Sequence, residues 1–188
     1  SLFQKDRNMG LFLIASAVYR DGLNTLFTVG GLYAAGTFGM EFTEILIFAI
    51  GLNVTSGIGA FAFAYMDDHK GAKPTIVVSL LALIALGIAI TVIDDKRTFM
   101  ILALALGLFI GPVQSSSRSL MARLSTKETS TEMFGLYAMT GKSIAFTGPL
   151  MFAFVTQLTD SQRWGIATII GLWLIGLLLL LKVKERHN

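Results

Sequence analysis

The sequence contains no cysteine and very little charge. Without cysteine, neither a disulfide nor a thiolate for catalysis or metal binding is available. Charged residues make up 14% of the 188 residues, whereas soluble domains carry about 25%, and 54% of the residues are hydrophobic. A soluble globular class is therefore excluded. The net charge of +3 belongs to loops between apolar segments, so no nucleic-acid surface is expected.

Motifs for catalysis and metal binding are missing as well. The two histidines, His69 and His187, fall in a predicted loop and in the C-terminal tail. HExxH, Gly-rich phosphate loops and Cys/His clusters do not occur. The pairs Asp67–Asp68 and Asp94–Asp95 fall in predicted loops, where solvated caps are favoured over acid–base dyads. We therefore expect no enzyme, no catalytic residues, no metal and no cofactor.

Long apolar runs dominate what is present. Each run is long enough to cross a hydrocarbon layer of about 30 Å as a helix. The predicted fold class is an all-α membrane protein whose six transmembrane helices form one domain over residues 1–188. The predicted spans are Met9–Tyr33, Phe42–Met66, Pro74–Ile93, Phe99–Ser117, Met133–Leu158 and Trp164–Leu181.

Basic residues divide unevenly between alternating loops. Ten lie on one side and three on the other, and the side richer in Lys and Arg is normally cytoplasmic. Both termini are therefore predicted to be cytoplasmic. The richer side holds Lys5, Arg7, Lys70, Lys73, Arg118, Arg123, Lys127, Lys182, Lys184 and Arg186, and the other holds Lys96, Arg97 and Arg163.

Charged residues inside predicted spans are the main candidates for a functional site. Asp21 lies roughly 18 Å along the first span, near the bilayer midplane, where a lipid-facing charge costs at least about 2.5 kcal/mol. Asp21, Asn24 and Thr25 share a helical face that must therefore look inward. Lys142 lies similarly deep in the fifth span, among small residues. The predicted substrate or coupling pathway comprises Arg20, Asp21, Asn24, Thr25, Gln114 and Lys142.

Two interpretations of these charges stay open. They line a water-accessible pathway, or Asp21 neutralises Arg20 or Lys142 as a structural ion pair while neighbouring Asn, Ser and Thr side chains join helices. In the fourth span Gly107 and Gly111 have GxxxG spacing, which indicates close helix packing, and Pro112 invites a kink.

The stretch "AYMDDHKGAK", residues 64–73, resembles the cytoplasmic loop motif of the major facilitator superfamily, G-x-x-x-D-R-x-G-R-R. Asp68 takes the aspartate position, Gly71 the turn glycine and Lys73 the final base, while three other positions differ. The resemblance implies a gate loop in which Asp68 pairs with a helix N-terminus or with a base such as Arg118 or Arg123. A plain solvated turn is the alternative.

Three longer stretches make the resemblance more specific. "YRDGLNTLFTVGGLYAAGTFGM", "GPVQSSSRSLMARL" and "TEMFGLYAMTGKSIAFTGPLMF" are similar to the C-terminal half of vacuole-effluxer-type permeases, a branch that includes fungal vacuolar amino-acid exporters and prokaryotic relatives. The resemblance implies helices seven to twelve of a twelve-helix transporter, with Ser1 in the central cytoplasmic loop. It also implies that the first and fourth spans line a cavity between two six-helix halves.

These observations lead to a functional hypothesis with one main alternative. We expect half of a secondary transporter that moves a small polar solute, such as an amino acid, by alternating access. The expected partners are the lipid bilayer, the solute, and the N-terminal half or a second copy. The expected location is a prokaryotic inner membrane, or the vacuolar membrane if the chain is fungal. The alternative is a non-transporting six-helix protein that dimerises with or regulates a partner, while a channel is disfavoured.

Overall fold

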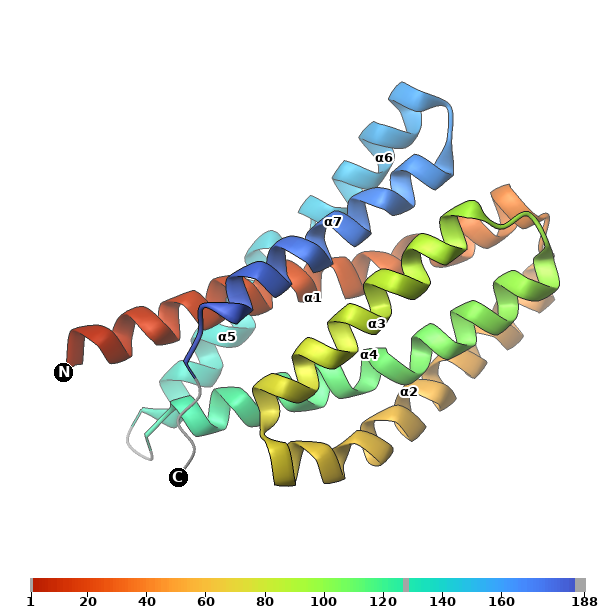
Figure 1. Cartoon of the computed structure of the whole chain (residues 1–188). Helices are drawn as coiled ribbons and strands as arrows, with labels where there is room; N and C mark the ends of the chain where they lie inside the picture. Colours follow the sequence, from red (N-terminus) through yellow and green to blue (C-terminus); the bar gives the residue numbers. More distant parts are fainter. Residues whose placement is uncertain (1, 127–128, 185–188) are drawn as a thin grey trace.

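The computed structural model describes residues 2–126 and 129–184, with side chains from Arg7 onward. These ranges are almost wholly helical and contain no strand, which confirms the predicted all-α class. Successive helices run in alternating directions along the bundle, except at residues 145–146, where the chain continues in the same direction after a short break (Figure 1). The helices are α1 (Leu2–Phe38), α2 (Phe42–Lys70), α3 (Ala72–Val92), α4 (Lys96–Leu124), α5 (Ser130–Ile144), α6 (Thr147–Thr159) and α7 (Gln162–Leu181).

Five segments of the described chain are long and apolar enough to cross a membrane, namely α2, α3, α4, α7 and the combined stretch Ser130–Thr159. The first helix is the longest, with 37 residues, but it does not reach the same hydropathy. Its middle carries Arg20, Asp21 and Asn24, which lower the average. These polar residues therefore set α1 apart from the other five spans.

The fifth predicted span, Met133–Leu158, consists of two helices instead of one. α5 ends at Ile144, and α6 begins at Thr147 after a turn at Ala145 and Phe146. Pro149 explains the break, because in a continuous helix its ring would clash with the carbonyl four residues earlier. Within the first turn of a new helix, its missing N–H is not needed. Sequence analysis did not predict this interruption.

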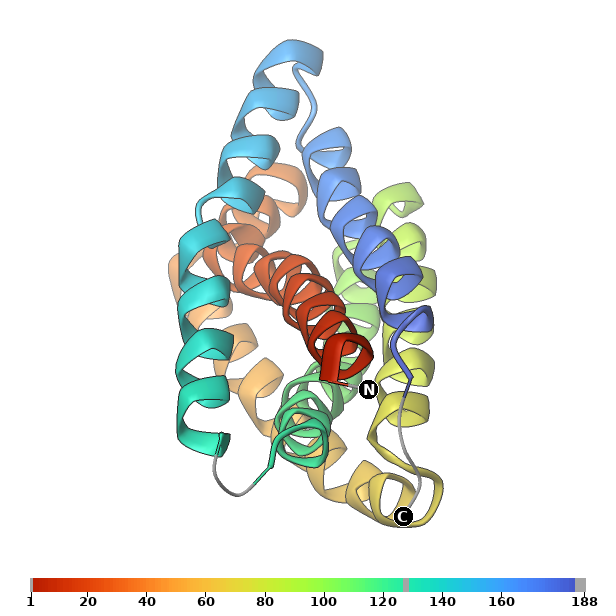
Figure 2. The same ribbon diagram turned by 90° about the vertical axis from the view of Figure 1, so that its left-hand side faces the viewer.

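Viewed end-on, α1 lies near the middle of the bundle (Figure 2). The pair α5 and α6 flanks α1 on one side, and α7 and α3 lie on the other. α4 packs between α2 and α3.

Glycines allow α2 and α4 to cross almost in backbone contact. A Cβ added at Gly59 would lie 1.8 Å from the carbonyl oxygen of Leu108, and one at Gly111 would lie 1.9 Å from that of Ser56. Such contacts are impossible for any side chain, so these positions require glycine. The packing interpretation of the GxxxG spacing is confirmed, and Pro112 lies within the helix that carries it.

Polar contacts tie helices together at both ends of the bundle. At the end where α1 begins and α7 ends, the Asn8 side chain exchanges two hydrogen bonds with the Lys184 backbone, of 2.8 and 2.7 Å. At the opposite end, Lys96 pairs with Glu44 at 2.5 Å, and Arg163 pairs with Asp94. These contacts join α1 to the end of α7, α2 to α4, and α7 to the α3–α4 connection.

Candidate functional site

Asp21 is buried in the middle of the bundle against the break between α5 and α6. The residue is 1% exposed, and its Oδ2 accepts a hydrogen bond from the Gly148 backbone N–H at 2.8 Å. Its Oδ1 is also buried and meets no hydrogen-bond donor among the described residues. Only one of the two oxygens of this carboxylate therefore has a hydrogen-bond donor.

The broken span creates the partner of this carboxylate. The first N–H groups of a helix have no acceptor within the helix, and their aligned dipoles favour a negative charge. Gly148 belongs to the first turn of α6, so its N–H is one of these free donors. Asp21 thus meets the N-terminus of a half-helix inside the predicted membrane region, where no bulk water is available to solvate either group.

The absence of a side chain at Gly148 brings α6 close to α1. An added Cβ would lie 1.9 Å from the Thr25 Oγ1 and 3.3 Å from the Asp21 Oδ1. Thr25 is itself fully buried, and its hydroxyl donates to the Asp21 carbonyl oxygen at 2.7 Å. Asp21, Thr25 and Gly148 therefore form one tightly packed contact between α1 and α6.

Arg20 points to α5 instead of pairing with its neighbour. Its Nη1 donates to the Tyr137 carbonyl oxygen at 3.2 Å, and its Cζ lies 4.0 Å from the centroid of the Tyr137 ring. Gly141 leaves room for the guanidinium, since a Cβ there would lie 3.1 Å from Nη1. The hypothesis of a structural ion pair between Asp21 and Arg20 is wrong, because successive helical residues point about 100° apart.

Lys142 does not reach Asp21 either. It lies on the exposed surface of α5, in the position after Gly141. No ion pair of Lys142 occurs within residues 7–126 and 129–184. The second version of the structural ion pair, between Asp21 and Lys142, is therefore also wrong.

The predicted polar face of α1 divides into two. Asp21 and Thr25 are one helical turn apart and face α6, whereas Asn24 and Thr28 are exposed. Gln114 of α4 is partly buried, and its backbone oxygen accepts a hydrogen bond of 3.3 Å from Arg118. The structure therefore brings Asp21 and Thr25 together with α6, and leaves Asn24 on the open face.

A buried contact between α1 and α4 was missed by sequence analysis. The Tyr19 hydroxyl lies 2.6 Å from the Ser117 Oγ, and Ser117 in turn donates to the Val113 carbonyl oxygen. Both side chains are completely buried. The signal in the sequence was a tyrosine directly before Arg20, within an apolar run.

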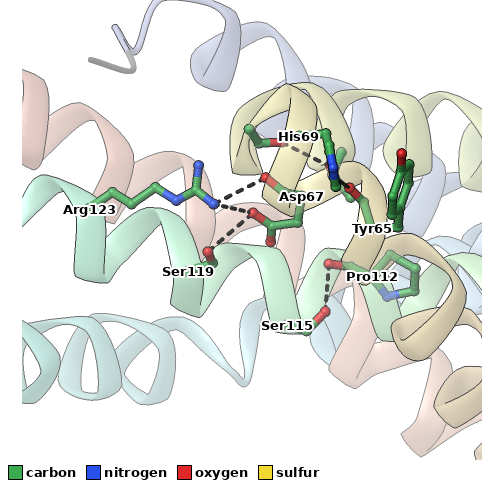
Figure 3. A network of polar contacts seen from close by, with 9 residues as sticks. Tyr65, Asp67, His69, Pro112, Ser115, Ser119 and Arg123 are labelled. Carbon is green, nitrogen blue, oxygen red and sulfur yellow. Dashed lines mark hydrogen bonds and ion pairs between the residues drawn. The ribbon is translucent and has the colours of Figure 1, made fainter. Parts of the chain in front are cut away.

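The gate loop differs from its prediction in one residue. Asp67, not Asp68, accepts from Arg123 at 2.8 Å and from Ser119 at 3.2 Å, as Figure 3 shows. Helix α2 continues to Lys70, so the two aspartates point in different directions, and Asp68 is exposed. The predicted role of Asp68 as the partner of a base is therefore wrong, and Arg123, one of the two bases named for it, pairs with Asp67 instead.

The other two gate-loop residues have clear structural roles. Gly71 has φ 101°, a conformation that L side chains rarely adopt, and it separates α2 from α3. The Lys73 Nζ donates to the carbonyl oxygens of Leu181 and Val183, at 3.0 and 2.6 Å. These oxygens at the end of α7 have no helical N–H partner, so Lys73 caps α7.

Two further observations concern ionisable groups. In the part of the chain that the structure describes, no cluster of three His, Cys, Asp or Glu residues lies close enough to hold a metal ion. In the α3–α4 connection, hydrogen bonds from the Thr98 hydroxyl and backbone N–H hold the pKa of Asp95 below its usual range. Asp95 therefore stays ionised as the N-cap of α4.

Residues 2–188 match the family described as vacuole effluxer Atg22 like. The chain is 27% identical over 182 residues to the uncharacterized MFS-type transporter YxiO of Bacillus subtilis, covering 97% of the chain and 42% of that protein. It is 26% identical over 174 residues to autophagy-related protein 22 of Cryptococcus neoformans var. neoformans serotype D, covering 84% and 30%. The Yarrowia lipolytica protein of that name is 25% identical over 191 residues, covering 95% and 32%. The chain spans less than half the length of these relatives.

Proposed function

Since the chain belongs to the vacuole effluxer Atg22-like family, we propose that it works as the C-terminal half of a secondary transporter that moves a small polar solute, such as an amino acid, by alternating access. The observation that carries this proposal is the buried Asp21 carboxylate held by the N-terminus of α6. Half-helices whose ends meet charged groups near the midplane are the usual construction of transporter sites.

Asp21 is proposed as the coupling residue. In its ionised form, the carboxylate accepts the Gly148 N–H and holds α6 against α1. When Oδ1 takes up a proton, the charge that favours the helix N-terminus is lost and the contact weakens. The position of α6 then follows the protonation of Asp21, so a proton gradient can drive the cycle.

The membrane setting follows the same proposal. Both termini face the cytoplasm, as the distribution of basic residues predicts. The exposed face beside Asn24 is covered by a second six-helix unit, either an N-terminal half or another copy, and the solute passes between them. The proposed location is a prokaryotic inner membrane, or a vacuolar membrane if the chain is fungal.

Uptake driven by a pH gradient tests the function. The complete protein is reconstituted in proteoliposomes, and accumulation of radiolabelled amino acids is compared for wild type, Asp21→Asn and the control Asp68→Asn, whose side chain is exposed. We expect Asp21→Asn to retain exchange of solute without a gradient but to lose accumulation at least tenfold. The control should behave as wild type.

Three results would count against this proposal. Full accumulation by Asp21→Asn refutes the coupling role of the carboxylate. Loss of the folded protein in the same variant, measured by size-exclusion chromatography, supports a purely structural carboxylate. Absence of transport by wild-type protein for every solute tested would favour the non-transporting alternative.

A further inference from the structure

The short segment that follows α7, residues 182–184, is fixed to the rest of the bundle. The Lys73 Nζ donates to two carbonyl oxygens, one at the end of α7 and one in this segment. The Asn8 side chain exchanges two hydrogen bonds with the Lys184 backbone, and the Val183 side chain is fully buried in the hydrophobic core. The segment is therefore anchored to both α1 and α3, whereas the ends of a chain are poorly ordered unless they are tied down.

Three exposed bases surround this anchored segment. Lys182 and Lys184 lie on either side of Val183, and Arg7 directly precedes Asn8, which binds the Lys184 backbone. None of the three side chains forms an ion pair or a hydrogen bond within residues 7–126 and 129–184. In the sequence, the stretches 5–7 and 182–186 carry five bases against two acids. Positive charge is thus concentrated where α1 begins and α7 ends, at one end of the bundle (Figure 1).

The acids that the structure describes at this end of the bundle lie on other helices. Asp67 is paired with Arg123, and the exposed Asp68 and Glu132 belong to α2 and α5. Helix α7 packs instead on α1, α3 and α6. The three bases therefore need an anion from outside the described residues to balance their charge.

An apolar surface adjoins the bases along α7. Leu174, Leu178 and Leu181 are each about half exposed, and their spacing of four and three residues places them in one stripe. The stripe ends directly before Lys182. A span that is apolar along its exposed face and basic at its end matches a phospholipid, because the acyl chains lie on the leucines while the headgroup reaches the bases.

We propose that Arg7, Lys182 and Lys184 bind the phosphate headgroup of an anionic phospholipid whose acyl chains lie along the leucine stripe of α7. Each base near an anionic membrane surface raises affinity about fivefold. The anchored backbone loses little freedom on binding, which favours this site over a mobile basic tail. The site is remote from the contact between Asp21 and α6, and it does not depend on the proposed transport function.

Lipid binding to the complete protein in a neutral maltoside detergent tests the site. Phosphatidylglycerol and the uncharged phosphatidylcholine are the probes, and retained lipid is counted by native mass spectrometry. We expect phosphatidylglycerol to bind at least about tenfold more tightly and to raise the unfolding temperature, since it bridges α1 and α7. Equal retention of the two lipids would overturn the proposal.

Two double variants with the same change of charge separate the site from general attraction. Lys182→Gln with Lys184→Gln should weaken phosphatidylglycerol binding about tenfold or more. Arg97→Gln with Arg118→Gln, which removes two exposed bases from α4, should leave it unchanged. Equal losses in the two proteins would overturn the proposal, because positive charge anywhere would then be sufficient.

A variant that keeps every charge tests the anchored backbone. Asn8→Ala removes both hydrogen bonds to the Lys184 backbone and should weaken lipid binding severalfold. Binding equal to that of wild type would refute the role of the anchor.

Two soluble anions separate a lipid site from a phosphate site. Glycerophosphoglycerol, which has the headgroup without acyl chains, and inorganic phosphate should displace bound phosphatidylglycerol only weakly, because neither contacts the leucine stripe. Displacement by inorganic phosphate as effective as that by free phosphatidylglycerol would show a site for phosphate alone and would overturn the lipid assignment.

Discussion

Replacing Gly148 by alanine should separate α6 from α1. The added Cβ would lie 1.9 Å from the Thr25 Oγ1, a separation that unbonded atoms do not adopt, and 3.0 Å from the Thr25 Cβ, which is tighter than most real Cβ contacts. Overpacking of this kind costs about 1–3 kcal/mol, and loss of a hydrogen bond to a charged acceptor costs about 1.5–3 kcal/mol. We expect Gly148→Ala to lower the free energy of unfolding by about 2.5–6 kcal/mol.

Unfolding of the complete protein in mixed detergent micelles, titrated with sodium dodecyl sulfate, measures this change. Gly171→Ala is the matched control, because a Cβ at that position of α7 meets nothing within 4 Å. Alanine there improves helix propensity by up to about 1 kcal/mol. A Gly148→Ala protein as stable as the Gly171→Ala protein would contradict the close approach of α6 to α1.

A double-mutant cycle with Thr25→Ala then assigns the cause. Thr25→Ala removes the oxygen that the new methyl group would strike, so the double variant should be less destabilised than the sum of the two single variants. Additive effects would mean that Thr25 is not the obstacle. Uptake measured beside stability should fall in Gly148→Ala, because the Asp21 carboxylate would lose the N–H that holds it.

Two further predictions concern the ends of the bundle. Asp67→Asn should lower the free energy of unfolding by about 1 kcal/mol, because the ion pair with Arg123 is only partly buried. The same variant should increase labelling, from the cytoplasmic side, of a cysteine placed at position 24. Asp68→Asn should change neither the stability nor the labelling, because Asp68 is exposed. Equal effects of the two variants would contradict the assignment to Asp67. The native chain has no cysteine, so single cysteines at the exposed Lys70 and Arg97 should label from opposite sides of the membrane, and labelling from the same side would refute the six-span topology.

Features that depend on local pattern could be predicted from the sequence. The all-α class and five of the apolar membrane segments follow from hydrophobic runs, the close packing of α4 follows from glycine spacing, and the turn at Gly71 follows from a motif. The resemblance to vacuole effluxers is confirmed by the family match over residues 2–188. Each of these features is encoded within a short stretch or a whole-chain pattern, so no knowledge of distant contacts was needed.

Features that depend on direction around a helix could not be predicted in the same way. The sequence places Arg20 and Asp21 together, but the helix turns them toward α5 and α6 respectively. Asp67 and Asp68 differ in the same way, because α2 continues past both of them. The break before Pro149 was also missed, since the hydrophobic run continues across it without a change in composition.

The arrangement at the middle of α1 links two halves of a broken span to adjacent residues of one helix. Arg20 holds α5 through Tyr137, and Asp21 holds α6 through Gly148. A small rotation of α1 about its own axis therefore moves the two attachment points along different directions, about 100° apart. An unbroken span would tilt as a whole, whereas this one has a break at Ala145 and Phe146, where the angle between α5 and α6 can change. The break in the fifth span thus allows a rotation of α1 to change the angle between α5 and α6.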